Sequence, residues 1–415
     1  MKFLNVLTLV LSVMLIASCQ QEAKQSVANT EETSLTTGKW RAEIALNDGS
    51  HKMPFNFEVI GNGHDQKIFI LNGEERLLLN ELNFNGDSVT IPMHIFDAEI
   101  VAKVEEGKLT GNYRKPGIYS LPFHAELGND RFTDNLEVPV ADVSGKWAVD
   151  FQKPDGNSTF AVGVFEQKGN QLTGTFMTQY GDYRFLEGIV TGKELKLSTF
   201  DGAHMYLFEA TIDGDQITQG DFWSGKTGHR TWTAKRDENV ALPDASSLTH
   251  LKEGFETIDF TFPNIEGKEV SISDERYKGK VVVVQILGSW CPNCMDETAF
   301  MAPFYQKYKD KGLEVIGLAY ENTDKLEVAA KKMKRMKDRF DIGYELLYAG
   351  QPKQAEASLP MLEKIVSFPT SILIDRNGKV VNIHTGFNGP GTGEYYDQFV
   401  EEFTAKVEHY LAEAQ

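Results

Sequence analysis

Cysteine is scarce in this chain, with three residues in 415: Cys19, Cys291 and Cys294. A fold held together by many disulfides is therefore excluded. Positive charge is also in short supply, because 42 Lys and Arg stand against 60 Asp and Glu, which gives a formal net charge of -18. Binding to a phosphate backbone needs clustered Lys and Arg, so this composition argues against a nucleic-acid partner.

The amino-terminal residues predict a secretory signal peptide over residues 1–18. Lys2 precedes a largely apolar segment, 3–16, which is too short to span a membrane comfortably. The exit Ile16-Ala17-Ser18-Cys19 is similar to a bacterial lipobox, and this resemblance implies cleavage before Cys19 and acylation of its thiol. The alternative is a structural Cys19 inside an apolar segment that is retained.

Residues 19–37 are polar and predict a flexible tether, because they have too little apolar surface to offset the entropy lost on ordering. Gln20, rather than Asp, follows the predicted lipidated cysteine. By the same resemblance, this favours the outer membrane. We therefore predict a protein anchored in the membrane through its lipid, on the periplasmic face of the bacterial outer membrane.

Short alternating apolar and polar runs, separated by Gly, Asn and Asp turns, fill residues 38–236. This spacing predicts antiparallel strands in a sandwich or a barrel. Gly38-Lys39-Trp40 recurs as Gly145-Lys146-Trp147, which predicts an internal duplication with β-rich repeats at 38–140 and 141–236. Chance recurrence of a tripeptide is the competing explanation.

The Gly-x-Trp start of each repeat faintly resembles the start of a lipocalin, in which the tryptophan closes one end of the barrel. A late arginine covers the tryptophan in that family, and Arg230 or Arg236 could do so in the second repeat. Binding of a small molecule is one interpretation, and a plain aromatic core is the other. No catalytic motif occurs in this half of the chain.

Residues 237–254 are polar, contain proline and predict a linker. Beyond it, strands and helices alternate from Val281 to Ala412, which predicts an α/β domain over 255–415 with parallel strands joined by crossover helices. Asn377-Gly378 stands between two apolar runs. It predicts a tight hairpin in which both residues have positive backbone angles.

The segment Trp290-Cys291-Pro292-Asn293-Cys294 directly follows the predicted strand 281–287. Pro292 suits the first position of a helix, which places Cys291 at the helix N-terminus. Unpaired amides there favour a thiolate, so Cys291 is predicted to be the attacking thiol and to have a lowered pKa. Cys294 lies one turn further on the same face and is predicted to be the resolving thiol.

The segment 255–415 is similar to the thioredoxin fold, and in particular to the TlpA/ResA-like thiol-disulfide oxidoreductases of the bacterial envelope. The resemblance rests on four landmarks in order: Tyr277–Lys280, Trp290–Cys294, Phe368–Thr370 and Asp375–Lys379. It implies a redox-active disulfide between Cys291 and Cys294, with no further cofactor. It also implies that Pro369, after Phe368, is a cis proline facing the cysteines, where the alternative is an ordinary trans proline on an edge strand.

One position departs from the thioredoxin pattern. Gln285 occupies the place where thioredoxins have a buried acid that shuttles protons. Glu297 matches an active-site glutamate of ResA-like proteins, and the resemblance implies that it replaces that acid. The alternative is a glutamate that faces solvent and is favoured by the helix dipole.

Other functions fit the sequence less well. Zinc would need two more ligands near the cysteine pair, and covalent haem attachment would need His where Met295 stands. Val284 and Gly288 occupy the Pro and Thr positions of the thiol peroxidase motif. The glycine-rich segment 386–393 lacks the lysine of a phosphate loop. The basic residues of 331–339 predict a solvated helix face, with docking of an acidic partner as the alternative.

The predicted function is therefore disulfide exchange with protein substrates, supplied by a thiol electron donor in the envelope. The family resemblance favours a reductase. The alternative from another class is a β-rich binding or scaffold lipoprotein, whose redox domain serves a client bound by residues 38–236. A thiol peroxidase is the less favoured enzyme.

Overall fold

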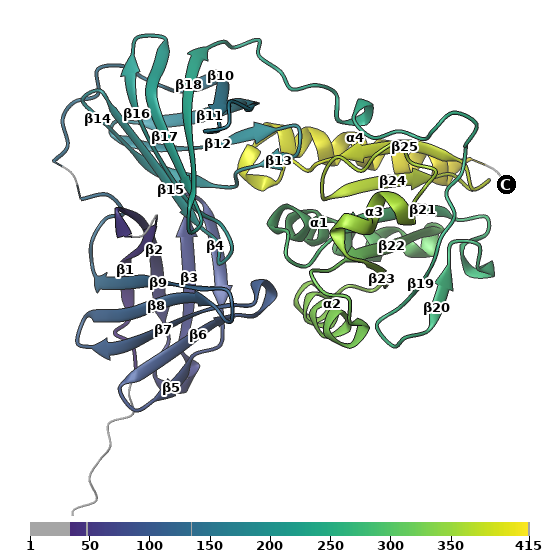
Figure 1. The fold of residues 1–415 in the computed structure, drawn as a ribbon, viewed down its shortest axis with the longest axis horizontal. Coiled ribbons are helices and arrows are strands. Elements are labelled where there is room, and N and C mark those ends of the chain that lie inside the picture. The colour runs from purple at the N-terminus through teal and green to yellow at the C-terminus, as the bar shows by residue number, and fades with distance from the viewer. Residues whose placement is uncertain (1–33, 47–48, 134, 414–415) are drawn as a thin grey trace, which may run out of the picture. The chain divides into compact units, whose positions relative to one another are not determined.

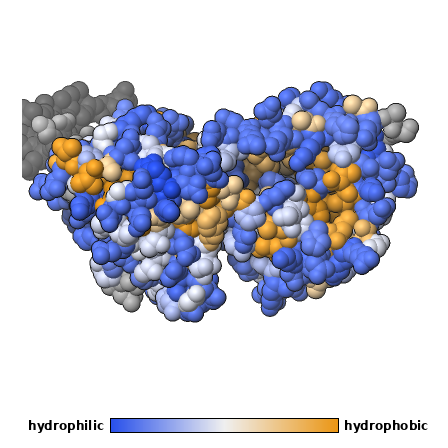
Figure 2. Space-filling view, turned by 90° about the horizontal axis from the view of Figure 1, so that it is seen from above, coloured by the Kyte–Doolittle hydropathy of each residue, from blue (hydrophilic) through white to orange (hydrophobic). Residues whose placement is uncertain are grey.

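A computed structural model describes residues 34–46, 49–133 and 135–413 (Figure 1). The predicted signal peptide and the predicted lipidation site at Cys19 lie outside these residues. Among the helices that are described, none has the length and apolar character needed to cross a membrane. Hydrophilic residues cover most of the face in Figure 2, and apolar residues show in smaller patches.

The first nine strands form one antiparallel sheet in the order β4-β3-β2-β1-β9-β8-β7-β6-β5. Side chains alternate between buried and exposed along β1, as the period of two requires. No hydrogen-bonded ladder joins β4 to β5 among the described residues, so this sheet is a half-barrel. Its strands are β1 (Gly38–Leu46), β2 (His51–Ile60), β3 (Lys67–Asn72), β4 (Glu75–Leu79), β5 (Asn83–Asn85), β6 (Ser88–Met93), β7 (Ala98–Glu105), β8 (Lys108–Lys115) and β9 (Tyr119–Leu127).

The next nine strands form a second antiparallel sheet, in the order β11-β10-β18-β17-β16-β15-β14-β12-β13. An additional ladder between β11 and β12 closes it into a barrel. Its strands are β10 (Gly145–Gln152), β11 (Ser158–Lys168), β12 (Gln171–Thr178), β13 (Gly181–Asp182), β14 (Leu186–Thr191), β15 (Glu194–Phe200), β16 (Met205–Asp213), β17 (Gln216–Ser224) and β18 (Gly228–Arg236).

The two repeats begin alike, which confirms the predicted β-rich, duplicated fold class. Trp40 and Trp147 are fully buried on the first strand of each sheet. Each indole N–H donates to a carbonyl oxygen four residues earlier, at 2.9 Å to Thr36 and 2.8 Å to Val143. Of the two predicted arginines it is Arg236 that covers Trp147, with its guanidinium carbon 4.5 Å from the ring centroid.

Aromatic side chains fill the interior of the closed barrel. Phe208 and Phe222 stack with their ring centroids 4.2 Å apart, and Phe176 lies 4.8 Å from Phe208. Close packing of this kind is typical of a core and favours that interpretation over a ligand cavity inside the barrel.

The remaining chain forms an α/β domain with the thioredoxin fold, here called the redox domain. Its central sheet has the order β23-β22-β21-β24-β25. Strands β21, β22 and β23 run parallel, β24 is antiparallel to β21, and β25 is antiparallel to β24. Every residue of β21 is buried, and all of them are apolar except Gln285. The strands of this sheet are β21 (Val281–Leu287), β22 (Leu313–Tyr320), β23 (Glu345–Gly350), β24 (Thr370–Ile374) and β25 (Val380–Thr385). A separate two-stranded sheet consists of β19 (Thr261–Pro263) and β20 (Glu269–Ser271).

Four α-helices accompany this sheet: α1 (Pro292–Tyr308), α2 (Leu326–Phe340), α3 (Ala355–Ser358) and α4 (Glu394–Ala412). The predicted hairpin between β24 and β25 is present, but the prediction of positive angles at both turn residues was wrong. Only Gly378 has a positive φ, of 83°. The Asp375 carboxylate shapes the turn instead, by accepting hydrogen bonds from the backbone N–H groups of Asn377 and Lys379, each at 2.9 Å.

The segment predicted as a linker, 237–254, contacts the redox domain near its end. Leu251 forms an isolated antiparallel bridge with Leu362. The fully buried hydroxyl of Thr249 accepts a hydrogen bond from Thr385 at 2.8 Å. These contacts hold the last residues of the segment against the domain that follows.

Candidate active site

The two cysteines lie at the start of α1 in different environments. Pro292 is the first residue of the helix and Cys291 is its N-cap, as predicted. The backbone N–H of Cys294 points at the sulfur of Cys291, 3.2 Å away. The pair forms a disulfide with Cα atoms 5.2 Å apart. Cys291 is 6% exposed and Cys294 is 0% exposed, so only Cys291 can be approached from solvent.

The loop before β24 brings two further predicted residues, Phe368 and Pro369, to the disulfide. The Phe368–Pro369 peptide bond is cis, as the family resemblance implied. The sulfur of Cys291 lies 3.6 Å from the carbonyl oxygen of Phe368. The Phe368 ring lies 5.6 Å from that of Trp290, whose indole N–H donates to the Tyr320 carbonyl at 2.8 Å. The aromatic pair therefore forms one wall of the site.

Glu297 is fully buried, so the interpretation as a glutamate facing solvent was wrong. The side-chain amide of Gln285 donates a hydrogen bond to its carboxyl at 2.7 Å. Burial raises the pKa of Glu297 to about 7, although hydrogen bonds from Gln285 and Ser371 act in the opposite direction. Gln285 and Glu297 thus form one buried unit in place of the single acid of thioredoxins.

Tyr344 completes this buried unit, and sequence reasoning missed it. Its hydroxyl donates to the other end of the Gln285 amide, at 3.1 Å. This bond fixes the orientation of the amide, so that its N–H₂ group faces Glu297. Tyr344 comes just before β23, two strands away from β21 in the sheet, and no local motif marks it.

Tyr344→Phe is expected to lower the free energy of unfolding by about 1 to 2 kcal/mol, because it leaves a buried amide oxygen without a partner. Urea unfolding of the full chain measures the change. Tyr348→Phe is a suitable control, since the Tyr348 hydroxyl donates to the Thr323 carbonyl in a partly buried site on β23. A loss no larger for Tyr344→Phe than for the control would contradict the proposed role.

Residues of the second β sheet reach the redox site. The side-chain amide of Asn293, between the two cysteines, donates to the Asp182 carbonyl at 3.2 Å. The Ser367 hydroxyl donates to the Tyr180 carbonyl at 3.0 Å. The carboxylate of Asp182 accepts the backbone N–H of Gly389 at 2.5 Å. The sequence contains no signal for these contacts, which join residues far apart in the chain.

A buried charge cluster centres on Arg184, whose side chain is 7% exposed. Its guanidinium pairs with Glu75 of β4 at 2.6 Å, with Asp201 at 3.1 Å, and with Asp296, two residues after Cys294. Burial, together with the nearby charge of Asp296, raises the pKa of Asp182 to about 6. The cluster joins both β sheets to α1.

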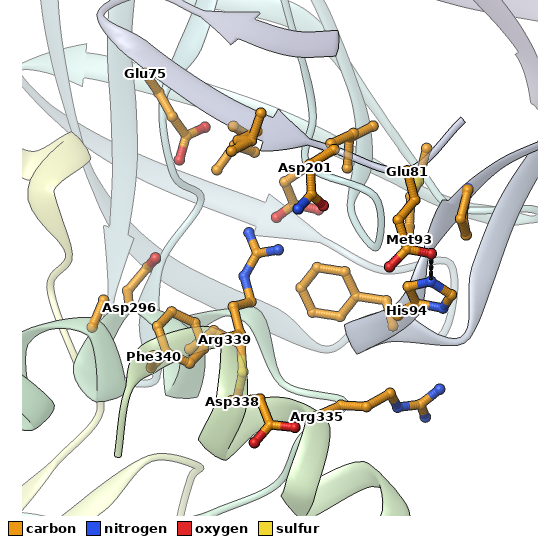
Figure 3. A pocket seen from close by; sticks show the side chains of 18 of the residues that line it. Glu75, Glu81, Met93, His94, Asp201, Asp296, Arg335, Asp338, Arg339 and Phe340 are labelled. Atoms are coloured by element: carbon orange, nitrogen blue, oxygen red, sulfur yellow. Dashed lines mark hydrogen bonds and ion pairs between the residues drawn. The ribbon is translucent and has the colours of Figure 1, made fainter. Parts of the chain in front are cut away.

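A cavity of about 780 Å³ lies beside this cluster. Figure 3 shows the side chains of Glu75 and Asp201 on one side of it, with Asp296 beside Phe340 and Arg339 of α2 on the other. Two residues of the predicted basic face of α2 form ion pairs within the chain. Lys332 pairs with Asp97 at 2.5 Å, and Arg335 pairs with it at 2.6 Å. Within the described ranges, no group of three or more His, Cys, Asp or Glu is placed to hold a metal ion.

Comparison with known proteins gives one consistent picture. The family model described as Redoxin matches residues 251–398. The thiol-disulfide oxidoreductase ResA of Bacillus thuringiensis subsp. konkukian (strain 97-27) is 31% identical over 155 residues, which cover 37% of this chain and 80% of that protein. The thioredoxin-like protein YneN of Bacillus subtilis (strain 168) is 26% identical over 136 residues, covering 33% and 73%.

Among solved structures, a putative thiol:disulfide interchange protein DsbE from Chlorobium tepidum is 26% identical, with a TM-score of 0.28. That match covers 37% of this chain and 98% of the solved one. Each of these similarities leaves more than half of the present chain unmatched.

Proposed function

Because this chain belongs to the ResA-like thiol-disulfide oxidoreductases through its redox domain, we propose that it acts as a disulfide reductase on protein substrates in the bacterial envelope. The observation that carries the proposal is the difference between the two cysteines. Cys291, at the start of a helix, is the more accessible of the two, and Cys294 is fully buried behind it. An attacking thiol and a resolving thiol need this arrangement.

In the proposed reaction the Cys291 thiolate attacks one sulfur of the substrate disulfide. A Cys291–substrate bond forms, the substrate S–S bond breaks, and one substrate thiolate leaves. The Cys294 thiolate then attacks the Cys291 sulfur and expels the second substrate thiolate. Two electrons pass to the substrate, whose two thiolates take up protons, and the chain ends with the Cys291–Cys294 disulfide.

We assign proton transfer at Cys294 to Glu297. Its pKa of about 7 allows it to take up or release a proton near neutral pH. Gln285 holds the carboxyl in place through the hydrogen bond at 2.7 Å. No cofactor other than the disulfide is required by this scheme.

The direction of exchange depends on the supply of electrons. The envelope is kept oxidising, so a reductase there has to be recharged by a reduced thiol carrier. We propose that such a donor reduces the Cys291–Cys294 disulfide after each cycle. The lipobox-like segment Ile16–Cys19 and the following Gln20 support attachment to the periplasmic face of the outer membrane.

Trapping with Cys294→Ser tests the proposal. Without the resolving thiol, the mixed disulfide on Cys291 is expected to accumulate, and mass spectrometry of material purified from envelope extracts identifies the attached proteins. Cys291→Ser serves as the control and should capture none of them. Identical sets of captured proteins for the two variants would rule out the proposed exchange.

A second candidate function is a β-rich binding module whose redox domain serves the bound client. The contacts of Tyr180 and Asp182 with the dithiol face favour it, because they place the second β sheet at the redox site. In that case the β sheet would help protein substrates to bind.

A further inference from the structure

The turn between β12 and β14, residues Gln179–Arg184, lies against the face of the redox domain that carries the disulfide. We call it the capping turn. It contacts three separate segments of the redox domain: the start of α1 through Asn293, the loop before the cis proline through Ser367, and the loop after β25 through Gly389. The first two of these contacts flank Cys291, because Asn293 lies two residues after it and the Phe368 carbonyl, next to Ser367, lies 3.6 Å from its sulfur. The capping turn therefore covers the surface on which a substrate has to dock.

The two surfaces meet at the backbone, without room for side chains between them. A Cβ atom added to Gly181 would lie 1.9 Å from the amide nitrogen of Asn293 and 3.2 Å from the Phe387 carbonyl oxygen. A Cβ added to Gly386 would lie 3.1 Å from the Gln179 carbonyl oxygen. Gly181 also has a φ of +133°, which residues with side chains rarely adopt.

Polar groups hold the capping turn in this position. The Asp182 carboxylate accepts hydrogen bonds from the backbone N–H groups of Gly389 and Arg184, both at 2.5 Å. Arg184 takes a left-handed conformation with a φ of +62° and pairs with Asp296 of α1. A non-glycine residue in this conformation persists only where its surroundings stabilise it, and the buried charge cluster does so.

We propose that the capping turn determines the specificity of the dithiol, admitting disulfides of small molecules and extended chains while excluding disulfides within a folded protein surface until the turn moves away. The inference rests on the exchange activity proposed above. With the turn in place Cys291 is only 6% exposed. The side chains of Asn293 and Ser367 are already hydrogen-bonded to the capping turn. A broad, rigid partner cannot reach the sulfur past these contacts.

Alkylation of the reduced full chain by two reagents tests the inference. N-ethylmaleimide and a maleimide carried on a polyethylene glycol chain share the same reactive group and differ in bulk. Gly181→Ala inserts a methyl group against Asn293, and Asp182→Ala removes the hydrogen bonds from Gly389 and Arg184. Gly225→Ala is the matched control, because Gly225 also has a positive φ, of +60°, but has nothing within 4 Å of an added Cβ.

The measured quantity is the alkylation rate of Cys291 by the bulky reagent divided by its rate with the small reagent. Both capping-turn variants are expected to raise this ratio by about fivefold, as the loss of about one net hydrogen bond predicts. The control should leave it unchanged. An unchanged or lowered ratio in the folded variants would overturn the inference. If the variants also reduced folded protein substrates more slowly than the unaltered chain, the result would favour a β module that binds clients. Circular dichroism checks folding, and Asp182→Ala decides the outcome if Gly181→Ala does not fold.

Reduction of glutathione disulfide by the pre-reduced, unaltered chain, followed over a single turnover, separates the two hypotheses. If turnover is present and the ratio does not change, the capping turn does not determine access. If turnover is absent and the ratio changes, the capping turn still limits access to Cys291, but the chain lacks the proposed exchange activity.

Discussion

Cys291→Ser is expected to lower the rate at which the pre-reduced chain reduces glutathione disulfide by about 10³-fold or more, because a serine hydroxyl cannot replace the thiolate nucleophile. The structure places the only solvent-accessible sulfur of the pair at this position, at the N-cap of α1. The backbone N–H of Cys294 points at that sulfur and would stabilise its negative charge. Loss of this one atom therefore removes the first step of the reaction.

Cys294→Ser should behave differently, and the contrast tests the assignment of roles. This variant retains the attack by Cys291 but cannot resolve the adduct, so it should release about one glutathione per protein and then stop. Rapid mixing with a chromogenic thiol assay measures the release. If Cys291→Ser formed the stable adduct and Cys294→Ser did not, the roles would be reversed.

Glu297→Gln is expected to raise the free energy of unfolding at pH 8 by up to about 3 kcal/mol relative to the unaltered chain, with little change below about pH 4. The cause is the burial of the carboxyl, which raises its pKa from 4.5 to about 7 in the folded state. The neutral acid is thus favoured by folding. Stability is highest below the unfolded pKa and falls as the pH rises from about 4.5 to 7, where the buried group ionises.

Glutamine has the same shape and stays neutral, so the variant should lose this pH dependence. Urea unfolding at several pH values measures it, and the pH profile of disulfide exchange should lose its step near pH 7 as well. Glu266→Gln, at an exposed position, is the control and should keep both profiles. If Glu297→Gln retained the step in the activity profile, Glu297 would not be the proton acceptor.

The redox domain could be predicted in large part because its signals are local. These signals are the largely apolar sequence of β21, the proline after Cys291 and the four short landmarks, and each of them depends on a few adjacent residues. The prediction of a positive φ at Asn377 was wrong, because the Asp375 carboxylate accepts hydrogen bonds from the turn and fixes its conformation. The interpretation of Glu297 as exposed failed because its burial depends on Gln285 and Tyr344, which lie on other elements.

The sequence alone determined the dithiol, the order of its two thiols along a helix, the α/β alternation and the repeated β-rich start. These features follow from the spacing of residues within one strand or one turn. The tertiary structure decided that the second sheet closes through the ladder between β11 and β12 while the first stays open. It also decided that Asp182 and Arg184 meet the active site, since a contact between residues more than a hundred positions apart depends on how packed surfaces fit together rather than on local periodicity.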